Sequence, residues 1–119
     1  MNHQLFTTLV ELVSHFTQVE QDELFSKSRK KALVDARYMI IYIARQLDIR
    51  LIYIQRYFKL KGFELHYTTL FHACKRVEQD KEKDEYVQEF INNILLQLNP
   101  SKVLSPEMVE DEDIINQLK

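Results

Sequence analysis

The sequence predicts an all-α fold, a compact bundle of five to six helices. Apolar residues recur at spacings of three and four through almost all of residues 3–98, the period of an amphipathic helix. One glycine and two prolines leave little material for the turns of a β protein. With 119 residues and a 45% apolar share, the chain is long enough to bury one core. We therefore expect one helical domain at residues 1–99 and an acidic, flexible tail at residues 100–119.

The first half of the chain predicts two helices and a short turn between them. An apolar stripe from Leu5 to Phe16 predicts a helix over residues 3–17. Asp22 is expected to cap a short turn that precedes the basic cluster KSRKK. The longest apolar stripe predicts the central core helix at residues 31–47.

Two shorter helices are predicted next. One covers residues 51–58 and ends before KLKGFELHY, the stretch that contains the only glycine. The other begins at Tyr67 or Thr68 and ends near Gln79, and Thr68 is expected to cap its first turn. Its inward-facing residues are expected to be Leu70, Phe71, Cys74 and Val77.

A charged connector, QDKEKDE, separates these helices from a last helix that ends before Pro100. Its apolar face is expected to hold Tyr86, Val87, Phe90, Ile91, Ile94, Leu95 and Leu98. This stripe exceeds what one small core needs, so a homodimer through the last helix is one interpretation. The tail that follows holds the acidic run EDED, which is either a solvated end or a shield for a basic face.

Charge is strongly polarised along the chain, although the formal net charge is only −2. Residues 27–76 hold twelve Lys or Arg against three acids, a net +9, while residues 1–26 and 77–119 are both acidic. A concentrated basic segment is typical of a surface that binds a polyanion.

The two helices predicted between residues 51 and 79 have the form of a helix-turn-helix. In that motif the N-terminal side chains of the second helix meet base edges in the major groove of DNA. Here those side chains are His66, Tyr67, Thr68 and Thr69, which donate or accept hydrogen bonds, stack, or contact thymine methyl groups.

The stretch YTTLFHACKRVEQD at residues 67–80 resembles part of a known signature. It is similar to the end of the pattern GGRDHTTVLHACRKIE in the DNA-binding domain (domain IV) of the bacterial replication initiator DnaA. Residues 22–58, DELFSKSRKKALVDARYMIIYIARQLDIRLIYIQRYF, resemble that domain's short helix, basic loop, central helix and first motif helix. The resemblance implies a DnaA domain IV fold, related to Trp-repressor-like helix-turn-helix domains, and binding of double-stranded DNA.

The resemblance also implies which residues contact DNA. Arg29 of the basic loop matches an arginine that enters the minor groove, and Lys31, Arg37 and Arg45 match residues that approach phosphates. The full set of expected DNA-binding residues is Lys27, Arg29, Lys30, Lys31, Arg37, Arg45, His66, Tyr67, Thr68, Thr69 and Lys75.

Two departures from the family pattern bear on function. Where the family has Asp-His before two threonines, this chain has His66-Tyr67, and its turn is longer and lacks Gly-Gly-Arg. The ATPase motif GxxxxGK[ST] is absent, so the sequence is not expected to be a complete initiator. The expected function is that of a stand-alone DNA-binding domain, a regulator of transcription or an accessory replication factor. The alternative is a protein-protein interaction module on the same scaffold that has lost base recognition.

Other classes of function find little support in the sequence. Cys74 and the four histidines lack the paired spacing of a zinc site, and no nucleophile lies beside a glycine-rich oxyanion loop. No apolar run approaches the length of a membrane span. We expect no enzyme activity, no metal, cofactor or small-molecule substrate, and, from the lone cysteine, a cytoplasmic location.

Overall fold

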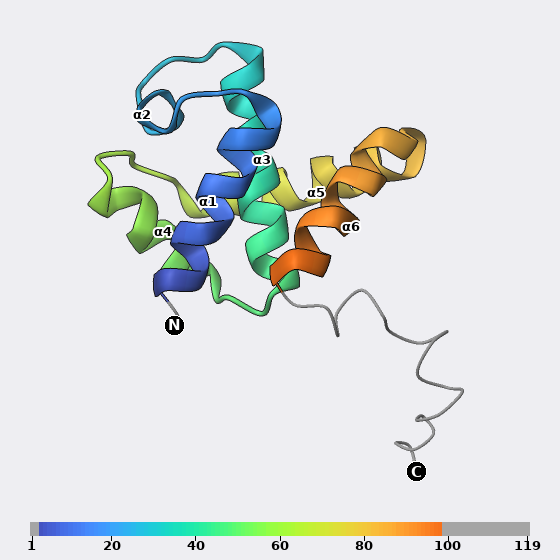
Figure 1. Cartoon of the computed structure of the whole chain (residues 1–119). Helices are drawn as coiled ribbons and strands as arrows, with labels where there is room; N and C mark the ends of the chain where they lie inside the picture. Colours follow the sequence, from blue (N-terminus) through green and yellow to red (C-terminus); the bar gives the residue numbers. More distant parts are fainter. Residues whose placement is uncertain (1–2, 99–119) are drawn as a thin grey trace.

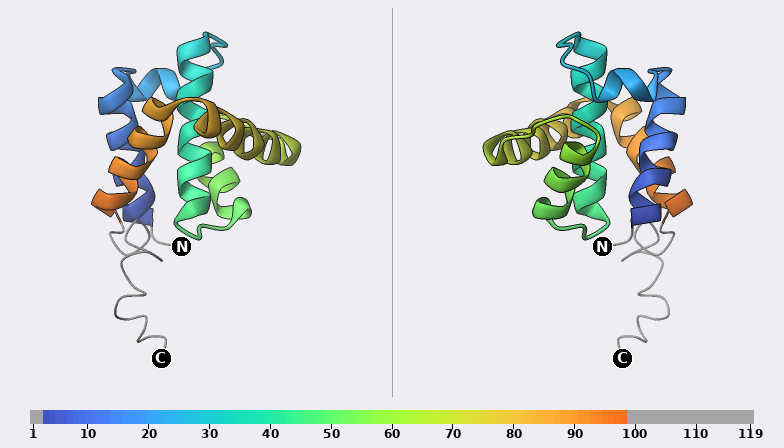
Figure 2. Two further views of the ribbon diagram at one scale, coloured as in Figure 1. Left: turned by 90° about the vertical axis from the view of Figure 1, so that its right-hand side faces the viewer. Right: turned by 90° about the vertical axis from the view of Figure 1, so that its left-hand side faces the viewer.

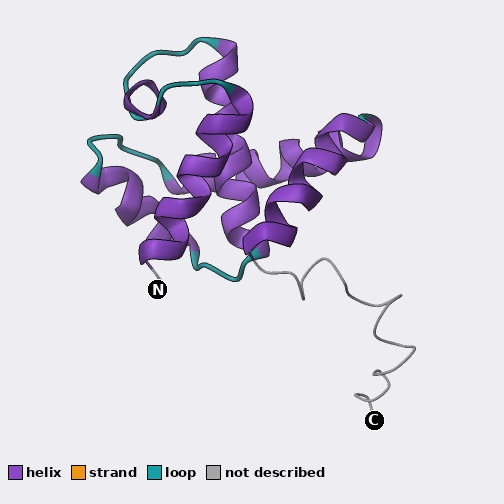
Figure 3. Cartoon of the chain, viewed as in Figure 1, coloured by secondary structure: helices purple, strands orange, loops and turns teal. Residues whose placement is uncertain are grey.

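The computed structural model describes residues 3–98, in which six helices are joined by loops and turns (Figures 1 and 3). This arrangement confirms the predicted all-α bundle. The predicted tail at residues 100–119 lies outside the described residues. In chain order the helices are α1 (His3–Thr17), α2 (Gln21–Leu24), α3 (Lys31–Gln46), α4 (Leu51–Leu60), α5 (Tyr67–Lys83) and α6 (Glu85–Leu98).

Helix α3 is the centre of the bundle and contacts every other described helix. Ile40, Ile41, Ile43 and Ala44 are fully buried, because this helix is covered by neighbours on almost all sides. Helices α1 and α6 lie on one side of α3, and α4 and α5 lie on the other, with α5 running across α3 (Figure 2). Helix α3 thereby positions both α5 and the loop that precedes α3. The candidate site lies between these two segments.

Helix α5 is longer than its apolar pattern predicts. It continues through most of the expected connector QDKEKDE, and only Asp84 separates it from α6. The apolar stripe fades in these last turns, but charged residues at helical spacing replace it. Arg76 pairs with Asp80 at 3.7 Å, and Lys81 pairs with Glu78 at 3.5 Å. Such pairs, in residues with good helix propensity, extend a helix beyond the core.

The expected side-chain caps are wrong at two helices. The residue before α2 is Glu20 and the residue before α5 is His66, and neither makes a side-chain cap hydrogen bond. Both helices begin earlier than a cap by Asp22 or Thr68 requires, so those two residues lie inside the first helical turn.

Two aromatic residues that were expected to face the core are exposed. Phe71 of α5 is 55% exposed and Tyr86 of α6 is 81% exposed. Each lies at the edge of an apolar stripe, and the structure buries only the centre of the stripe: Leu70, Ala73 and Val77 in α5, and Ile91, Ile94 and Leu95 in α6.

The apolar face of α6 is used within the chain. Ile91, Ile94 and Leu95 join the common core, and α6 contacts α1, α3 and α5. Less apolar surface of α6 is therefore left over for a homodimer interface than the sequence indicates. The homodimer stays a prediction.

Candidate nucleic-acid interface

Helix α4, the turn at residues 61–66 and helix α5 form the helix-turn-helix. Gly62 ends α4 with a φ of +91°, a conformation that favours glycine. Its N–H donates to the Lys59 carbonyl at 2.9 Å, and the Phe63 N–H donates to the Phe58 carbonyl at 2.8 Å. This is the hydrogen-bond pattern of a Schellman motif, and the accompanying apolar contact is made by the rings of Phe58 and Phe63. The only glycine of the chain thus fixes where the turn begins.

The second half of the turn is held against α4. The Gln55 side-chain amide donates to the Leu65 carbonyl at 2.7 Å, and the Leu65 side chain is buried. Helix α5 then begins at Tyr67, and the N–H of Thr69 donates to the His66 carbonyl. The first turn of α5 is exposed at His66, Tyr67 and Thr68. Backbone N–H groups at such a helix start favour a nearby anion.

Arg37 connects the basic loop, residues 25–30, to the core. Its guanidinium donates to three carbonyl oxygens at the end of α2: Leu24 from Nε at 2.6 Å, and Ser26 and Glu23 from Nη2 at 2.9 and 3.4 Å. These bonds give partners to carbonyl groups at the C-terminal end of a four-residue helix, where few backbone donors are available; of the three, the Glu23 carbonyl also accepts from the Ser26 N–H at 3.1 Å. Arg37 therefore fixes the path of the chain into the basic loop.

The same guanidinium lies over the ring of Phe63, 4.5 Å from its centroid. Arg37 thereby joins the basic loop to the turn of the helix-turn-helix, two segments far apart in the sequence. Its pKa is lowered from the ordinary value, first by burial and then by the positive charge of Arg29. The resemblance implies that Arg37 approaches phosphate, but the residue is only 5% exposed and its guanidinium is used within the protein.

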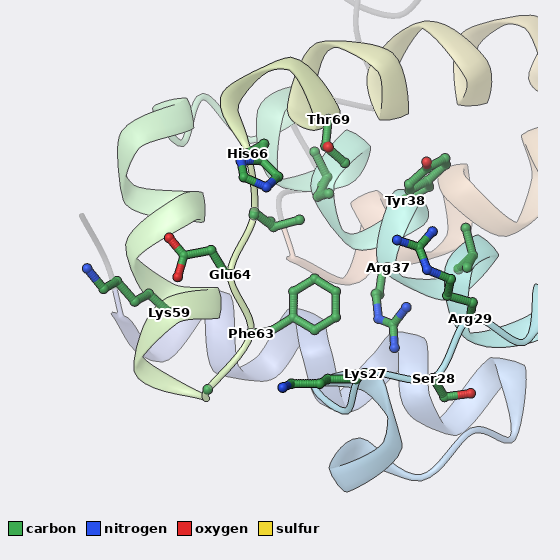
Figure 4. Close-up of a pocket in the computed structure, with 14 residues that line it drawn as sticks. Lys27, Ser28, Arg29, Arg37, Tyr38, Lys59, Phe63, Glu64, His66 and Thr69 are labelled. Carbon is green, nitrogen blue, oxygen red and sulfur yellow. The ribbon is translucent and has the colours of Figure 1, made fainter.

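An open groove of about 790 Å³ lies between the basic loop and the first turn of α5 (Figure 4). We call it the basic groove. In Figure 4, Arg37 lies between Phe63 and Arg29, while His66 and Thr69 lie above them on α5 and its approach. The polar residues that line it are Lys27, Ser28, Arg29, Arg37, Tyr38, Lys59, Glu64, His66 and Thr69.

The charged side chains that line the basic groove are mostly positive. Four cationic side chains line it, and Glu64 is the one carboxylate among the lining residues. Five of the residues predicted from sequence meet here: Lys27, Arg29, Arg37, His66 and Thr69. The sequence did not predict Lys59, in the last turn of α4, or Phe63 and Glu64, in the turn that follows. Their only sequence signal was membership of the +9 block and closeness to Gly62.

Lys31 and Arg76 share one carboxylate beside the groove. Asp35 accepts from Lys31 at 2.8 Å and from Arg76 at 3.0 Å, so it ties the start of α3 to α5. The Arg76 guanidinium also lies over the ring of Tyr38 at 5.5 Å. Lys31 remains exposed, but part of its charge is balanced within the protein.

The other predicted DNA-binding residues lie outside the groove. Lys30 is exposed in the basic loop, and Tyr67, Thr68 and Lys75 are exposed on α5. Arg45 lies at the far end of α3, where it donates to the Ile49 carbonyl at 3.0 Å. The candidate interface therefore consists of the basic groove, the exposed face of α5 and Arg45.

A second polar cluster holds α5 on α3. The Tyr42 hydroxyl donates to Glu78 at 2.5 Å, and Lys81 donates to the Tyr42 hydroxyl at 3.2 Å. The hydrogen bond from Tyr42 lowers the pKa of Glu78, and the bond to Tyr42 raises the pKa of Lys81. Burial raises the pKa of Tyr42. The cluster adds a specific contact between the central helix and the second half of α5.

Protein stability is expected to fall in acid partly through this cluster. Because the pKa of Glu78 is lower in the folded chain than its ordinary value of 4.5, its contribution is present above that pH and is lost as the pH falls below it. The contribution is about 0.5 kcal/mol or less, since Glu78 is half exposed and screened. Urea unfolding between pH 3 and 6 should show a shallower acid loss for Glu78→Gln than for wild type. Equal pH profiles would contradict this role.

Metal binding, membrane insertion and thiol reactivity can each be compared with the geometry of the described residues. Among residues 3–98, no three His, Cys, Asp or Glu side chains come together in a way that would hold a metal ion. None of the helices α1 to α6 is long and apolar enough to cross a membrane. Cys74 is half-buried between α5 and its neighbours, and burial raises the pKa of its thiol, which disfavours the reactive thiolate.

Two helices joined by the turn at residues 61–66, and flanked by a groove rich in Lys and Arg, define a helix-turn-helix domain with a surface suited to a polyanion. The chain belongs to the family described as "Bacterial dnaA protein helix-turn-helix", whose profile matches residues 6–77. This confirms the resemblance found in the sequence, and membership suggests DNA binding.

Curated relatives are chromosomal replication initiator proteins DnaA. The protein from Aquifex aeolicus is 35% identical over 77 residues, which cover 64% of this chain and 18% of the relative. That from Lachnoclostridium phytofermentans is 28% identical over 93 residues, covering 78% of this chain and 20% of the relative. The chain thus spans about a fifth of the length of these relatives. No solved structure matches the chain significantly.

Proposed function

We propose that this chain binds double-stranded DNA. The N-terminal half of α5 enters the major groove, and the basic loop follows the backbone into the adjacent minor groove. The observation that carries this proposal is the basic groove, which sets three exposed cationic side chains, Lys27, Arg29 and Lys59, beside the exposed first turn of a recognition helix. Phosphate contacts from Lys and Arg fix the register of such a helix, and its leading side chains select the sequence.

The proposed role is non-enzymatic. Family membership supports an action on DNA in replication initiation or transcription, as a regulator or an accessory factor. The proposed location is cytoplasmic, because Cys74 is the one cysteine of the sequence.

A salt titration of binding to random duplex DNA tests the proposal. If about five phosphates are neutralised, log affinity should fall with log salt at a slope of roughly −4 to −5. Fluorescence anisotropy with a labelled duplex between 50 and 300 mM salt measures the slope. A binding constant that does not change with salt would contradict the proposal.

Two variants that each remove one positive charge make the test specific to the groove. Arg29→Ala is expected to weaken binding about tenfold or more and to reduce the slope by about one. Lys83→Ala, at the opposite end of α5, removes the same charge and should change neither quantity measurably. Equal effects of the two variants would indicate a general charge effect and would contradict the assignment to the basic groove.

The protein-interaction alternative is favoured by one observation, the exposed aromatic residues Tyr67 and Phe71 on the outer face of α5. Under this alternative duplex DNA binds weakly or not at all, and Arg29→Ala plus Lys31→Ala leaves that binding unchanged. The same titration, extended to this double variant, separates the two functions.

A further inference from the structure

The first two turns of α5 present an aromatic pair to solvent. Tyr67 is 51% exposed and Phe71 is 55% exposed, and their rings meet edge to face with centroids 5.2 Å apart. They are four residues apart and therefore lie on the same face of the helix. Each ring covers part of the other, but neither is part of the core.

This pair lies among polar and cationic side chains. Thr68, His72 and Lys75 are exposed on the same outer part of α5, whereas Leu70, Ala73 and Val77 face the core. Carboxylates on α5 begin only at Glu78. The aromatic pair therefore lies in the half of α5 that is free of acidic residues. This half directly follows the turn at residues 61–66, part of which lines the basic groove.

Cationic groups lie on both flanks of this half-helix. Thr69 and His66 line the basic groove on one flank. On the other flank, Arg45 is exposed in the last turn of α3, the helix against which α5 packs. A partner that fits this surface is anionic along two edges and offers apolar groups between them. A T-rich duplex has this pattern, because two phosphate backbones border a major groove in which the thymine 5-methyl is the apolar group.

We propose that Tyr67 and Phe71 determine sequence preference by covering thymine 5-methyl groups in the major groove. The inference rests on the proposed function and adds the class of DNA that is preferred. It also gives a role to two residues that differ from the usual polar composition of a base-recognising surface. Lys75, one turn beyond Phe71, contacts phosphate in this arrangement, while Thr68 contacts a base edge.

Deoxyuridine tests this proposal, because it pairs like thymidine but lacks the 5-methyl group. Wild-type protein is compared on a T-rich duplex and on the same duplex with every dT replaced by dU, at one salt concentration. Binding to the dU duplex should be about fourfold weaker for each methyl group that the pair covers, since burial of one methyl is worth about 0.8 kcal/mol and 1.4 kcal/mol is a factor of ten.

Variants assign the difference to the aromatic pair. Phe71→Ala and Tyr67→Ala should each reduce the dT-to-dU ratio toward one, while Tyr67→Phe, which keeps the ring, should retain it. Tyr86→Ala removes an exposed aromatic residue from α6 and is the matched control with an unchanged ratio. Thermal melting of each variant verifies folding, which these exposed positions should leave intact.

The outcomes separate the two proposals. Salt-dependent binding with equal affinity for dT and dU duplexes would overturn the thymine assignment and leave DNA binding standing; the aromatic face would then suit a protein partner. A dT preference that survives both alanine variants would overturn the role of the pair. Absence of salt-dependent binding to either duplex would overturn the proposed function and, with it, this inference.

Discussion

Replacing Arg37 by methionine is expected to lower the free energy of unfolding by about 3 kcal/mol. Methionine keeps much of the apolar stem but donates no hydrogen bond. The carbonyl groups of Glu23, Leu24 and Ser26 would lose a charged donor, and the Phe63 ring would lose its cationic partner. Urea denaturation measures the change as a lower midpoint at an unchanged slope.

Arg45→Met is the matched control for this prediction. Arg45 is an exposed residue of the same helix and makes one hydrogen bond, to the Ile49 carbonyl. Its replacement should cost about 1 kcal/mol or less. If the two variants have the same stability, then Arg37 does not organise the basic loop. Amide exchange in residues 25–30 gives an independent measurement, and it should accelerate only in Arg37→Met.

Phe58→Ala should destabilise the protein by about 3 to 5 kcal/mol, which is the range for a large aromatic residue removed from a core. Phe58 is fully buried near the end of α4. Its ring lies 5.2 Å from that of Phe25 and 5.8 Å from that of Phe63, so it packs against both the basic loop and the turn. Chemical denaturation is the measurement.

The exposed Phe71 provides the control for this substitution. Phe71→Ala removes the same atoms from the surface of α5 and should change stability by about 0.5 kcal/mol or less. Similar losses for Phe58→Ala and Phe71→Ala would mean that the burial assigned to these two rings is wrong.

Much of the fold follows from apolar spacing because that spacing is a direct consequence of burying one face of a helix. The stripe over residues 31–47 predicts α3 to within one residue. The pattern fails where other forces maintain a helix, as in the last turns of α5, where ion pairs rather than apolar residues continue the helix to Lys83. It also fails at stripe edges, where Phe71 and Tyr86 lie outside the core and are exposed.

The burial of Arg37 could not be predicted from the sequence. An arginine beside an apolar stripe is usually exposed, and only three-dimensional structure brings the carbonyls that end α2 to its guanidinium. The same reason applies to Phe63 and Lys59. The place of Phe63 depends on the path of the turn after Gly62, which the sequence marks with one glycine but does not trace. Lys59 belongs to the last turn of α4, beyond the expected helix end at residue 58. Arg29 and Thr69, by contrast, could be predicted from the matched motifs and do line the groove.

The contact of Arg37 with both the α2 carbonyls and Phe63 has a mechanical consequence. One side chain contacts both the loop and the turn, so we expect a displacement of either segment by a binding partner to displace the other. In the proposed complex with duplex DNA, this coupling would fix the separation between the protein's contacts in one groove and its contacts in the next. Any mismatch in that separation must be taken up by bending or twisting the duplex. The stiffness of the DNA, at base pairs that the protein never touches, then becomes part of target selection.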